Sequence, residues 1–266
     1  MLLCVDVGNT ETKLGFFGVP ASGLGLEMVA EWRVTTVRRR TSDEYGVLFA
    51  ALFNEAGIAL GAVRAIAMAS VVPQVDRELR EGCRRYFKTD PLVLSGRSQR
   101  VMEVRTDRPA ELGADMLAAA IGARGKYGLP AIVIGYGTAT TFSAISREGA
   151  FLGTAIAPGI LISIDALVGR TAKLPQVAFE APASPIGRET VESLQSGLVY
   201  GFVGQSEGMI ARFKALLGAE ARVVATGGLA DVVAEHTSAI DAVDPFLTLE
   251  GLKIFWEAEV AAPSFR

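Results

Sequence analysis

The sequence predicts an α/β protein built from two duplicated domains with a cleft between them. An apolar strand, a tight turn rich in glycine and hydroxyl side chains, and a second apolar strand cover residues 2–17. The same pattern returns at 132–145, so that Gly137 stands 129 residues after Gly8 in a chain of 266. Elsewhere, strand-like runs alternate with amphipathic runs, as in βαβ units. A repeat at about half the chain length predicts domains at 1–128 and 129–266.

The first domain is expected to begin with the hairpin of 2–17 and a third strand. Thr41 is expected to cap the first helix, because Glu44 three residues later completes a capping box. The apolar stripe of that helix consists of Tyr45, Leu48, Phe49 and Leu52. The remaining predicted elements are strands at 27–35, 65–72 and 92–94, and helices at 75–87 and 111–127.

The second domain is expected to begin at Pro130. An apolar stretch at 150–167, interrupted by Pro158 and two glycines, is interpreted as buried strand and loop. A helix at 189–217 is predicted, with a break near Gly201 or Gly204 left open. The other predicted elements are strand pairs at 131–146 and 151–157, a strand at 222–225, and a helix at 249–260 that packs back onto the first domain.

Composition excludes several classes of protein. Half of the residues are apolar and 21% are charged, which is typical of a soluble globular protein. A net charge of −3 argues against a nucleic-acid-binding surface. No signal peptide and no uninterrupted apolar run of about 20 residues is present, so we expect a cytoplasmic protein without a membrane span. Two isolated cysteines and the single His236 leave no zinc cluster.

The first turn carries groups suited to binding phosphate. Gly8 lets the backbone approach a ligand closely, and Lys13 adds positive charge. Side chains that donate to oxygen are those of Asn9, Thr10 and Thr12. Asp6 repels phosphate, so it suits a Mg²⁺ that accompanies phosphates, bound directly or through water. The alternative is a hairpin in which Asp6 and Asn9 only form the turn, and this stretch alone does not separate the two interpretations.

The repeat favours the phosphate interpretation. Aligning Gly8 with Gly137 places Asn9 on Thr138 and Asp6 on Gly135. Both stretches resemble the two phosphate loops of the superfamily of acetate kinase, sugar kinases, Hsp70 and actin. That resemblance implies two duplicated ribonuclease-H-like (actin-like ATPase) domains with ATP bound between them.

The sequence resembles one family of this superfamily more closely, the type III pantothenate kinases. Each motif is weak alone, but the ordered series from residue 4 to residue 252 is specific. The motifs are Asp6-Val7-Gly8-Asn9-Thr10, Ser42-Asp43-Glu44-Tyr45-Gly46, Ser70-Val71-Val72-Pro73, Gly113-Ala114-Asp115, Gly137-Thr138-Ala139-Thr140-Thr141, Ala155-Ile156-Ala157-Pro158-Gly159-Ile160, Ala172-Lys173-Leu174-Pro175, Ile186-Gly187, Thr190-Val191-Glu192, Gln195-Ser196-Gly197, Thr226-Gly227-Gly228-Leu229-Ala230 and Leu247-Thr248-Leu249-Glu250-Gly251-Leu252.

The resemblance implies ATP-dependent phosphorylation of pantothenate to 4′-phosphopantothenate, the first step of coenzyme A biosynthesis, by a homodimer. Asp115 would accept the proton of pantothenate's primary hydroxyl; without the family motif, an acid in a first helical turn is explained by the helix dipole. ATP and Mg²⁺ would be bound by Asp6, Gly8, Asn9, Thr10, Lys13, Gly137, Thr138, Gly227 and Gly228. Pantothenate would be bound by Gly113, Ala114, Asp115, Met116 and Thr190.

Two departures from the family pattern fall in the substrate and cation region. Gly135 stands where the family has an aspartate that holds K⁺ or NH₄⁺, so that the cation is lost, held by backbone carbonyls and water, or replaced by another positive group. Met116 stands where the family has arginine, and Arg108 is a candidate to replace that charge. Three hypotheses remain: an active pantothenate kinase with an altered cation requirement, a kinase of another small hydroxylated acceptor, or a catalytically impaired nucleotide-binding regulator.

Overall fold

The computed structural model describes residues 1–266 apart from 21–22, 24, 98, 172 and 262–266. The chain divides into two compact units. Unit 1 comprises Met1–Glu103, Asp107–Gly125 and Leu247–Arg266, and unit 2 comprises Val104–Thr106 and Lys126–Phe246. The C-terminal helix therefore packs with unit 1, as expected from the sequence, although the predicted range 129–266 grouped it with the second half.

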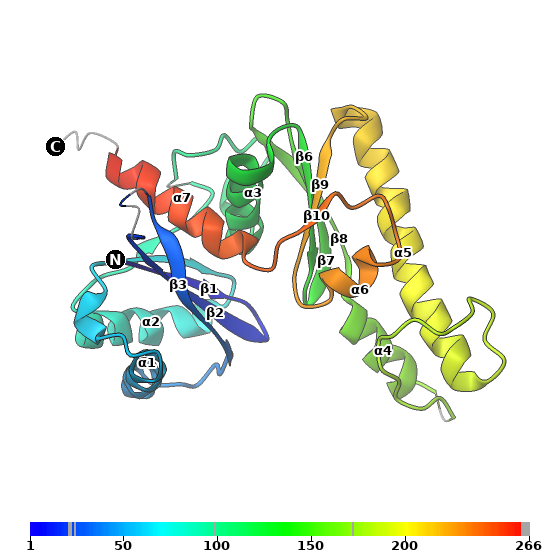
Figure 1. The fold of residues 1–266 in the computed structure, drawn as a ribbon, viewed down its shortest axis with the longest axis horizontal. Coiled ribbons are helices and arrows are strands. Elements are labelled where there is room, and N and C mark those ends of the chain that lie inside the picture. Colours follow the sequence, from blue (N-terminus) through cyan, green and yellow to red (C-terminus); the bar gives the residue numbers. More distant parts are fainter. Residues whose placement is uncertain (21–22, 24, 98, 172, 262–266) are drawn as a thin grey trace. The chain divides into compact units, whose positions relative to one another are not determined.

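Unit 1 contains a five-stranded mixed sheet in the order β3-β2-β1-β4-β5 (Figure 1). Its strands are β1 (Leu2–Val7), β2 (Glu11–Gly18), β3 (Glu27–Thr35), β4 (Ala65–Ser70) and β5 (Leu92–Val93). β1 is antiparallel to β2 and parallel to β4. The hairpin, the third strand and the βαβ-like pairing of β1 with β4 are therefore those that the sequence predicts.

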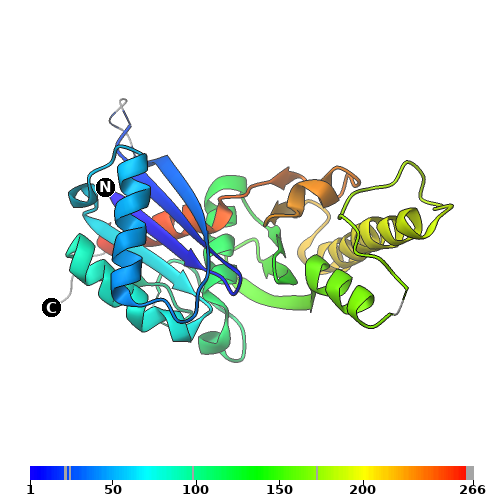
Figure 2. The same ribbon diagram turned by 90° about the horizontal axis from the view of Figure 1, so that it is seen from below.

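Helices cover both faces of this sheet. They are α1 (Ser42–Glu55), α2 (Pro73–Gly82) and α7 (Leu247–Ala261), and α3 (Ala114–Tyr127) packs against α7. α1 and α2 bury one face, where Phe16, Phe49 and Phe53 form part of the core, and Figure 2 shows α1 lying across the strands. α7 covers the other face. The predicted capping box is confirmed, since the Thr41 amide donates to Glu44 Oε2 at 2.7 Å.

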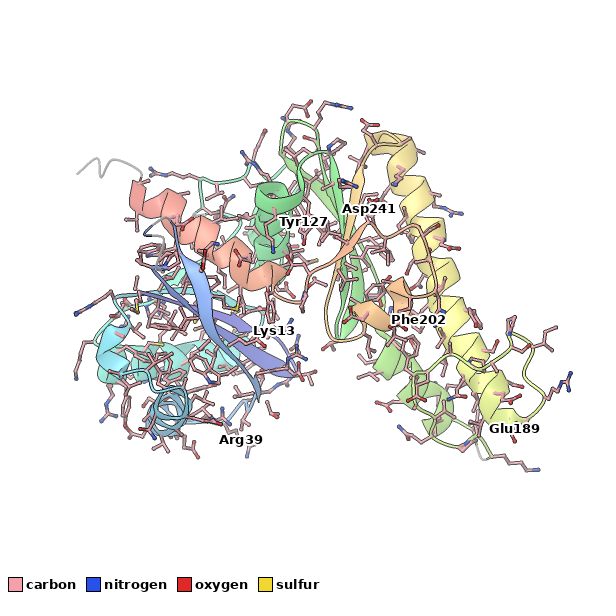
Figure 3. The ribbon with its side chains drawn as sticks, viewed as in Figure 1. Lys13, Arg39, Tyr127, Glu189, Phe202 and Asp241 are labelled. Atoms are coloured by element: carbon pink, nitrogen blue, oxygen red, sulfur yellow. The ribbon has the colours of Figure 1, made fainter. Side chains whose placement is uncertain are left out.

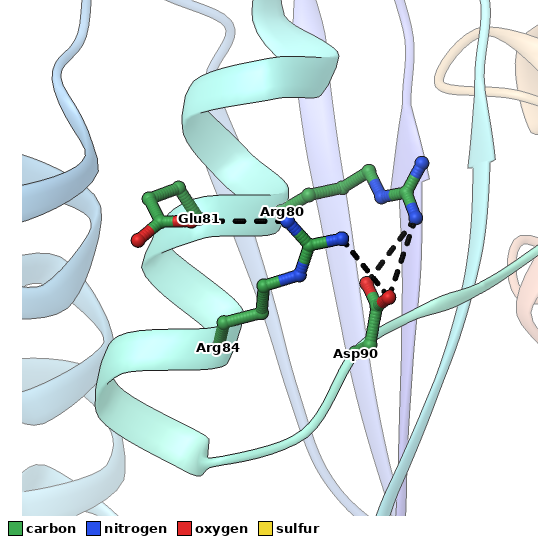
Figure 4. A network of polar contacts seen from close by, with 4 residues as sticks. All are labelled: Arg80, Glu81, Arg84 and Asp90. Carbon is green, nitrogen blue, oxygen red and sulfur yellow. Dashed lines mark hydrogen bonds and ion pairs between the residues drawn. The ribbon is translucent and has the colours of Figure 1, made fainter.

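The helix predicted at 75–87 is α-helical only as far as Gly82. α2 stops at Gly82 and is followed by a π-helical turn, Cys83–Phe87, and by Lys88 with a positive φ of 58°. Arg80 Nη2 and Arg84 Nη2 donate to the Asp90 carboxylate at 3.2 and 3.0 Å, which closes this turn (Figure 4). The bond from Arg84 is the main reason that the pKa of Asp90 lies below its usual value.

Unit 2 repeats the sheet of unit 1. Its strands are β6 (Ala131–Tyr136), β7 (Ala139–Ile145), β8 (Phe151–Pro158), β9 (Arg222–Thr226) and β10 (Ala242–Val243), in the order β10-β9-β6-β7-β8. β6 is antiparallel to β7 and parallel to β9, as β1 is to β2 and β4. Strand order and direction therefore match one for one, which confirms the predicted duplication.

The helices of unit 2 are α4 (Ile160–Gly169), α5 (Thr190–Leu217) and α6 (Ala230–Ala234). α5 runs unbroken through Gly201 and Gly204, so the suggested break is wrong; an internal glycine weakens a helix by only about 1 kcal/mol relative to alanine. The loop interpretation within 150–167 is also wrong, because α4 begins after the Pro158-Gly159 pair. Among the described residues, no helix has the length and apolar composition required to cross a bilayer.

Candidate active site

Asp6 is a buried carboxylate in the hydrophobic strand β1. Its exposed fraction is 7%, and Thr248 Oγ1 on α7 donates to its Oδ2 at 2.9 Å. Its other oxygen, Oδ1, is buried and has no hydrogen-bond partner. An unpaired buried carboxylate oxygen is costly, and its hard oxygen suits Mg²⁺ or a water bound to Mg²⁺.

The turn after β1 depends on glycine. The Gly8 amide donates to the Glu11 carbonyl at 2.9 Å, and a Cβ atom on Gly8 would lie 2.9 Å from that same oxygen. Asn9 and Thr10 are exposed at the tip of this turn. Lys13 on β2 (labelled in Figure 3) is the register partner of Asp6, and its positive charge partly offsets the rise in the pKa of Asp6 that burial causes. The structure thus brings together the residues that the sequence predicts for one phosphate loop.

Asp115 belongs to the same unit as Asp6 and interacts with it electrostatically. It lies in the first turn of α3, where its Oδ1 accepts a hydrogen bond from the Met116 amide at 2.7 Å. Burial raises its pKa. Burial first, and the charge of Asp115 second, raise the pKa of Asp6 to about 6. A buried carboxylate whose pKa is raised by burial and by a neighbouring acid is typical of a functional site.

Close packing of α3 against α7 fixes the elements that carry these groups. A Cβ atom on Gly251 would overlap the Ala118 carbonyl, and one on Gly122 would overlap the Leu247 carbonyl. The glycines therefore let the two helix backbones approach each other. Sequence reasoning included Thr248 in a family motif but gave it no role, since its contact with Asp6 spans 242 residues.

The hairpin of unit 2 has a similar turn that is one residue shorter, since Tyr136 pairs with Thr140 where Val7 pairs with Thr12. The Gly137 amide donates to the Ala139 carbonyl at 3.1 Å, and Thr138 is exposed beside it. Gly227 has a φ of +103°, and a Cβ atom there would overlap the Tyr136 carbonyl at the end of β6. Gly227 and exposed Gly228 form the turn from β9 into α6, which is their structural role; their role toward a nucleotide stays a prediction.

Gly135 has no side chain that could bind a cation, whereas the family that the sequence resembles has an aspartate at this position. It pairs with Thr141 on β7 and with Thr226 on β9. A Cβ atom at Gly135 would lie 2.7 Å from Thr141 Oγ1, so that hydroxyl already fills part of the space that a side chain needs. Thr226 Oγ1 is buried without a hydrogen-bond partner. No set of three or more His, Cys, Asp and Glu side chains able to hold a metal occurs among the described residues.

The predicted pantothenate contacts are divided between the units. Gly113, Ala114, Asp115 and Met116 lie in unit 1 and Thr190 in unit 2. Thr190 begins α5 and lines an open cavity of about 470 Å³. The cavity is lined by Leu174, Gly187, Arg188, Glu189, Thr190, Ser193 and Leu194. Arg108 Nη1 forms an exposed ion pair with Glu111 Oε1 at 3.1 Å, and its role as a replacement for the missing arginine stays a prediction.

The sequence profile of the type III pantothenate kinases matches residues 2–212. The type III pantothenate kinase of Moorella thermoacetica is 45% identical over 257 residues, which cover 97% of this chain and 99% of that protein. That of Myxococcus xanthus is 46% identical over 256 residues, covering 96% and 98%.

Solved structures that are similar to this chain share its fold at low sequence identity. A Baf family transcriptional activator of Campylobacter jejuni has a TM-score of 0.61 at 17% identity, covering 97% of this chain and 99% of that one. The activator of 2-hydroxyisocaproyl-CoA dehydratase from Clostridium difficile, solved with bound ADPNP, has a TM-score of 0.52 at 12% identity, covering 97% and 96%.

Proposed function

Because the chain belongs to the type III pantothenate kinase family, we propose that it transfers a phosphoryl group from ATP to pantothenate, forming 4′-phosphopantothenate, the first step of coenzyme A biosynthesis. The observation that carries the proposal is the match of nearly the whole chain to kinases of this one specificity. The interacting Asp6 and Asp115 of unit 1 support it.

Asp115 is proposed as the base that accepts the proton of the primary hydroxyl. Burial raises the pKa of Asp115, which makes its carboxylate a stronger base. The hydrogen bond from the Met116 amide to Oδ1 fixes the orientation of that carboxylate. General-base help contributes about 10²–10⁴ in rate. Gly113, Ala114 and Met116 of the same segment, and Thr190, are proposed to contact pantothenate.

Asp6 is proposed to hold the Mg²⁺ that accompanies ATP, directly or through water. The buried, unpartnered Oδ1 fits that ion, and when bound Mg²⁺ neutralises charge on the phosphates. The phosphates themselves are proposed to be bound by the hairpin residues Gly8, Asn9, Thr10, Lys13, Gly137 and Thr138, and the nucleotide by Gly227 and Gly228. Because Gly135 lacks the carboxylate ligand, we propose that this kinase needs no monovalent cation.

A cytoplasmic homodimer that binds no nucleic acid is part of the same proposal. Exposed apolar side chains in the second half of the chain could be covered by a second subunit. Ile156 on β8 is 64% exposed, and Leu161 and Ile162 on α4 are 59% and 46% exposed. Equilibrium sedimentation at micromolar concentration tests the dimer, and a monomer under those conditions would refute it.

The function is tested by mixing the protein with ATP, Mg²⁺ and pantothenate and measuring ADP and phosphopantothenate. We expect turnover by the wild type, and a loss of about 10²–10⁴ in kcat for Asp115→Asn with nucleotide binding retained. Nucleotide binding without any phosphopantothenate would instead favour the other two hypotheses, a different hydroxylated acceptor or a catalytically impaired regulator.

A further inference from the structure

The hydrogen bond between Thr248 and Asp6 joins the two ends of the chain. Thr248 Oγ1 donates to Asp6 Oδ2 at 2.9 Å, and both residues are 7% exposed. A threonine hydroxyl that faces a carboxylate donates its proton to it, and such charge-assisted bonds are stronger than neutral ones. This contact fixes one of the two oxygens of Asp6.

Thr248 is itself held in place by its surroundings. It lies in the first turn of α7, next to Leu247, whose carbonyl oxygen would overlap a Cβ atom on Gly122. On its other side, Leu249 Cδ1 lies 3.0 Å from the position of a Cβ atom on Gly15 in β2. The backbone of α7 therefore has little freedom to move at Thr248, and its hydroxyl stays next to Asp6.

The second oxygen of Asp6 has no hydrogen-bond partner in the protein. Oδ1 is buried without a partner, and the negative charge of Asp115 acts on the same carboxylate. If Thr248 served only to satisfy a buried carboxylate, a second donor on Oδ1 would be expected as well. One oxygen that is hydrogen-bonded and one that is buried without a protein partner is the arrangement expected of a carboxylate prepared for a cation.

We propose that Thr248 is a positioning residue, whose hydroxyl orients the Asp6 carboxylate so that Oδ1 faces the Mg²⁺ bound with ATP. The proposal rests on the proposed use of Mg²⁺ and ATP and does not depend on the identity of the acceptor. It assigns to α7 a role in metal binding in addition to its packing role.

The test is calorimetric binding of a non-hydrolysable ATP analogue to the full chain, with saturating Mg²⁺ and separately with EDTA. Thr248→Val removes the donor and keeps the shape of the side chain. We expect it to raise the Kd about tenfold in Mg²⁺ and to change it less than about twofold in EDTA. Thr248→Ser keeps the hydroxyl and is expected to restore wild-type affinity in Mg²⁺.

Ser206→Ala is the matched control, because it removes another buried hydroxyl, which bonds to Tyr136 in unit 2, and it should leave both Kd values unchanged. Equal weakening in Mg²⁺ and in EDTA by Thr248→Val would show a purely structural role and overturn the proposal, as would unchanged binding in Mg²⁺. If Thr248→Val does not fold, Thr248→Ala is measured in the same way. The two proposals can fail separately. If Thr248→Val loses affinity for the ATP analogue only in Mg²⁺, while the wild type does not phosphorylate pantothenate, this inference is supported and the proposed function is overturned.

Discussion

Replacing Asp6 by asparagine should stabilise the fold at alkaline pH. The pKa of this carboxyl rises from 3.8 to about 6 on folding, first because of burial and second because of the charge of Asp115. A raised pKa in a folded acid means that the native state binds protons more tightly than the unfolded state. Stability is therefore highest below the unfolded pKa, and it falls as the pH rises towards about 6.

The size of this effect follows from the pKa difference. About two pKa units correspond to about 3 kcal/mol of destabilisation above pH 7. Asparagine is always neutral and can still accept the bond from Thr248. We therefore expect Asp6→Asn to raise the free energy of unfolding by up to about 3 kcal/mol at pH 8, with the gain disappearing below about pH 4.

The assay is urea denaturation of wild type and Asp6→Asn at intervals between pH 4 and pH 8, without nucleotide or Mg²⁺. Asp115→Asn serves as a second perturbation: it removes the neighbouring charge, so the pKa of Asp6 should fall and the pH-dependent loss of stability should become smaller. The reasoning would be refuted if Asp6→Asn were less stable than wild type at pH 8. It would also be refuted if the two proteins had the same stability at every pH.

Other predictions concern glycines. Wild-type turnover should change less than about twofold when K⁺ or NH₄⁺ replaces a large organic cation, because Gly135 offers no carboxylate; tenfold activation would contradict this. Gly251→Val should destabilise the chain by more than about 2 kcal/mol in denaturant titration, since a Cβ atom there overlaps the Ala118 carbonyl. Gly227→Ala should cost about 1–3 kcal/mol because of its positive φ, and wild-type stability in that variant would show that the turn after β9 relaxes.

The parts of the fold that the sequence predicts correctly are those with a strong local signal. Alternating apolar runs on either side of Gly8 and Gly137 define the two hairpins, and Thr41 with Glu44 defines a helix start within four residues. The duplication followed from aligning the two turns, and the matching strand orders confirm it.

Features that depend on distant residues were not predictable in this way. α4 was missed because Leu161 and Ile162 are exposed, whereas an apolar run was taken to be buried. Nothing local to Asp6 indicates that Thr248, 242 residues later, donates to it. The space beside Gly135 is likewise set by Thr141 on a neighbouring strand, which only the register of β6 and β7 reveals.

The most direct test of the account is the formation of phosphopantothenate by wild type and by Asp115→Asn at saturating ATP, Mg²⁺ and pantothenate. We expect turnover by the wild type and a loss of about 10²–10⁴ in the variant, which should still bind the non-hydrolysable ATP analogue. A wild type that binds the analogue and forms no phosphopantothenate, or a variant that retains full activity, would contradict it.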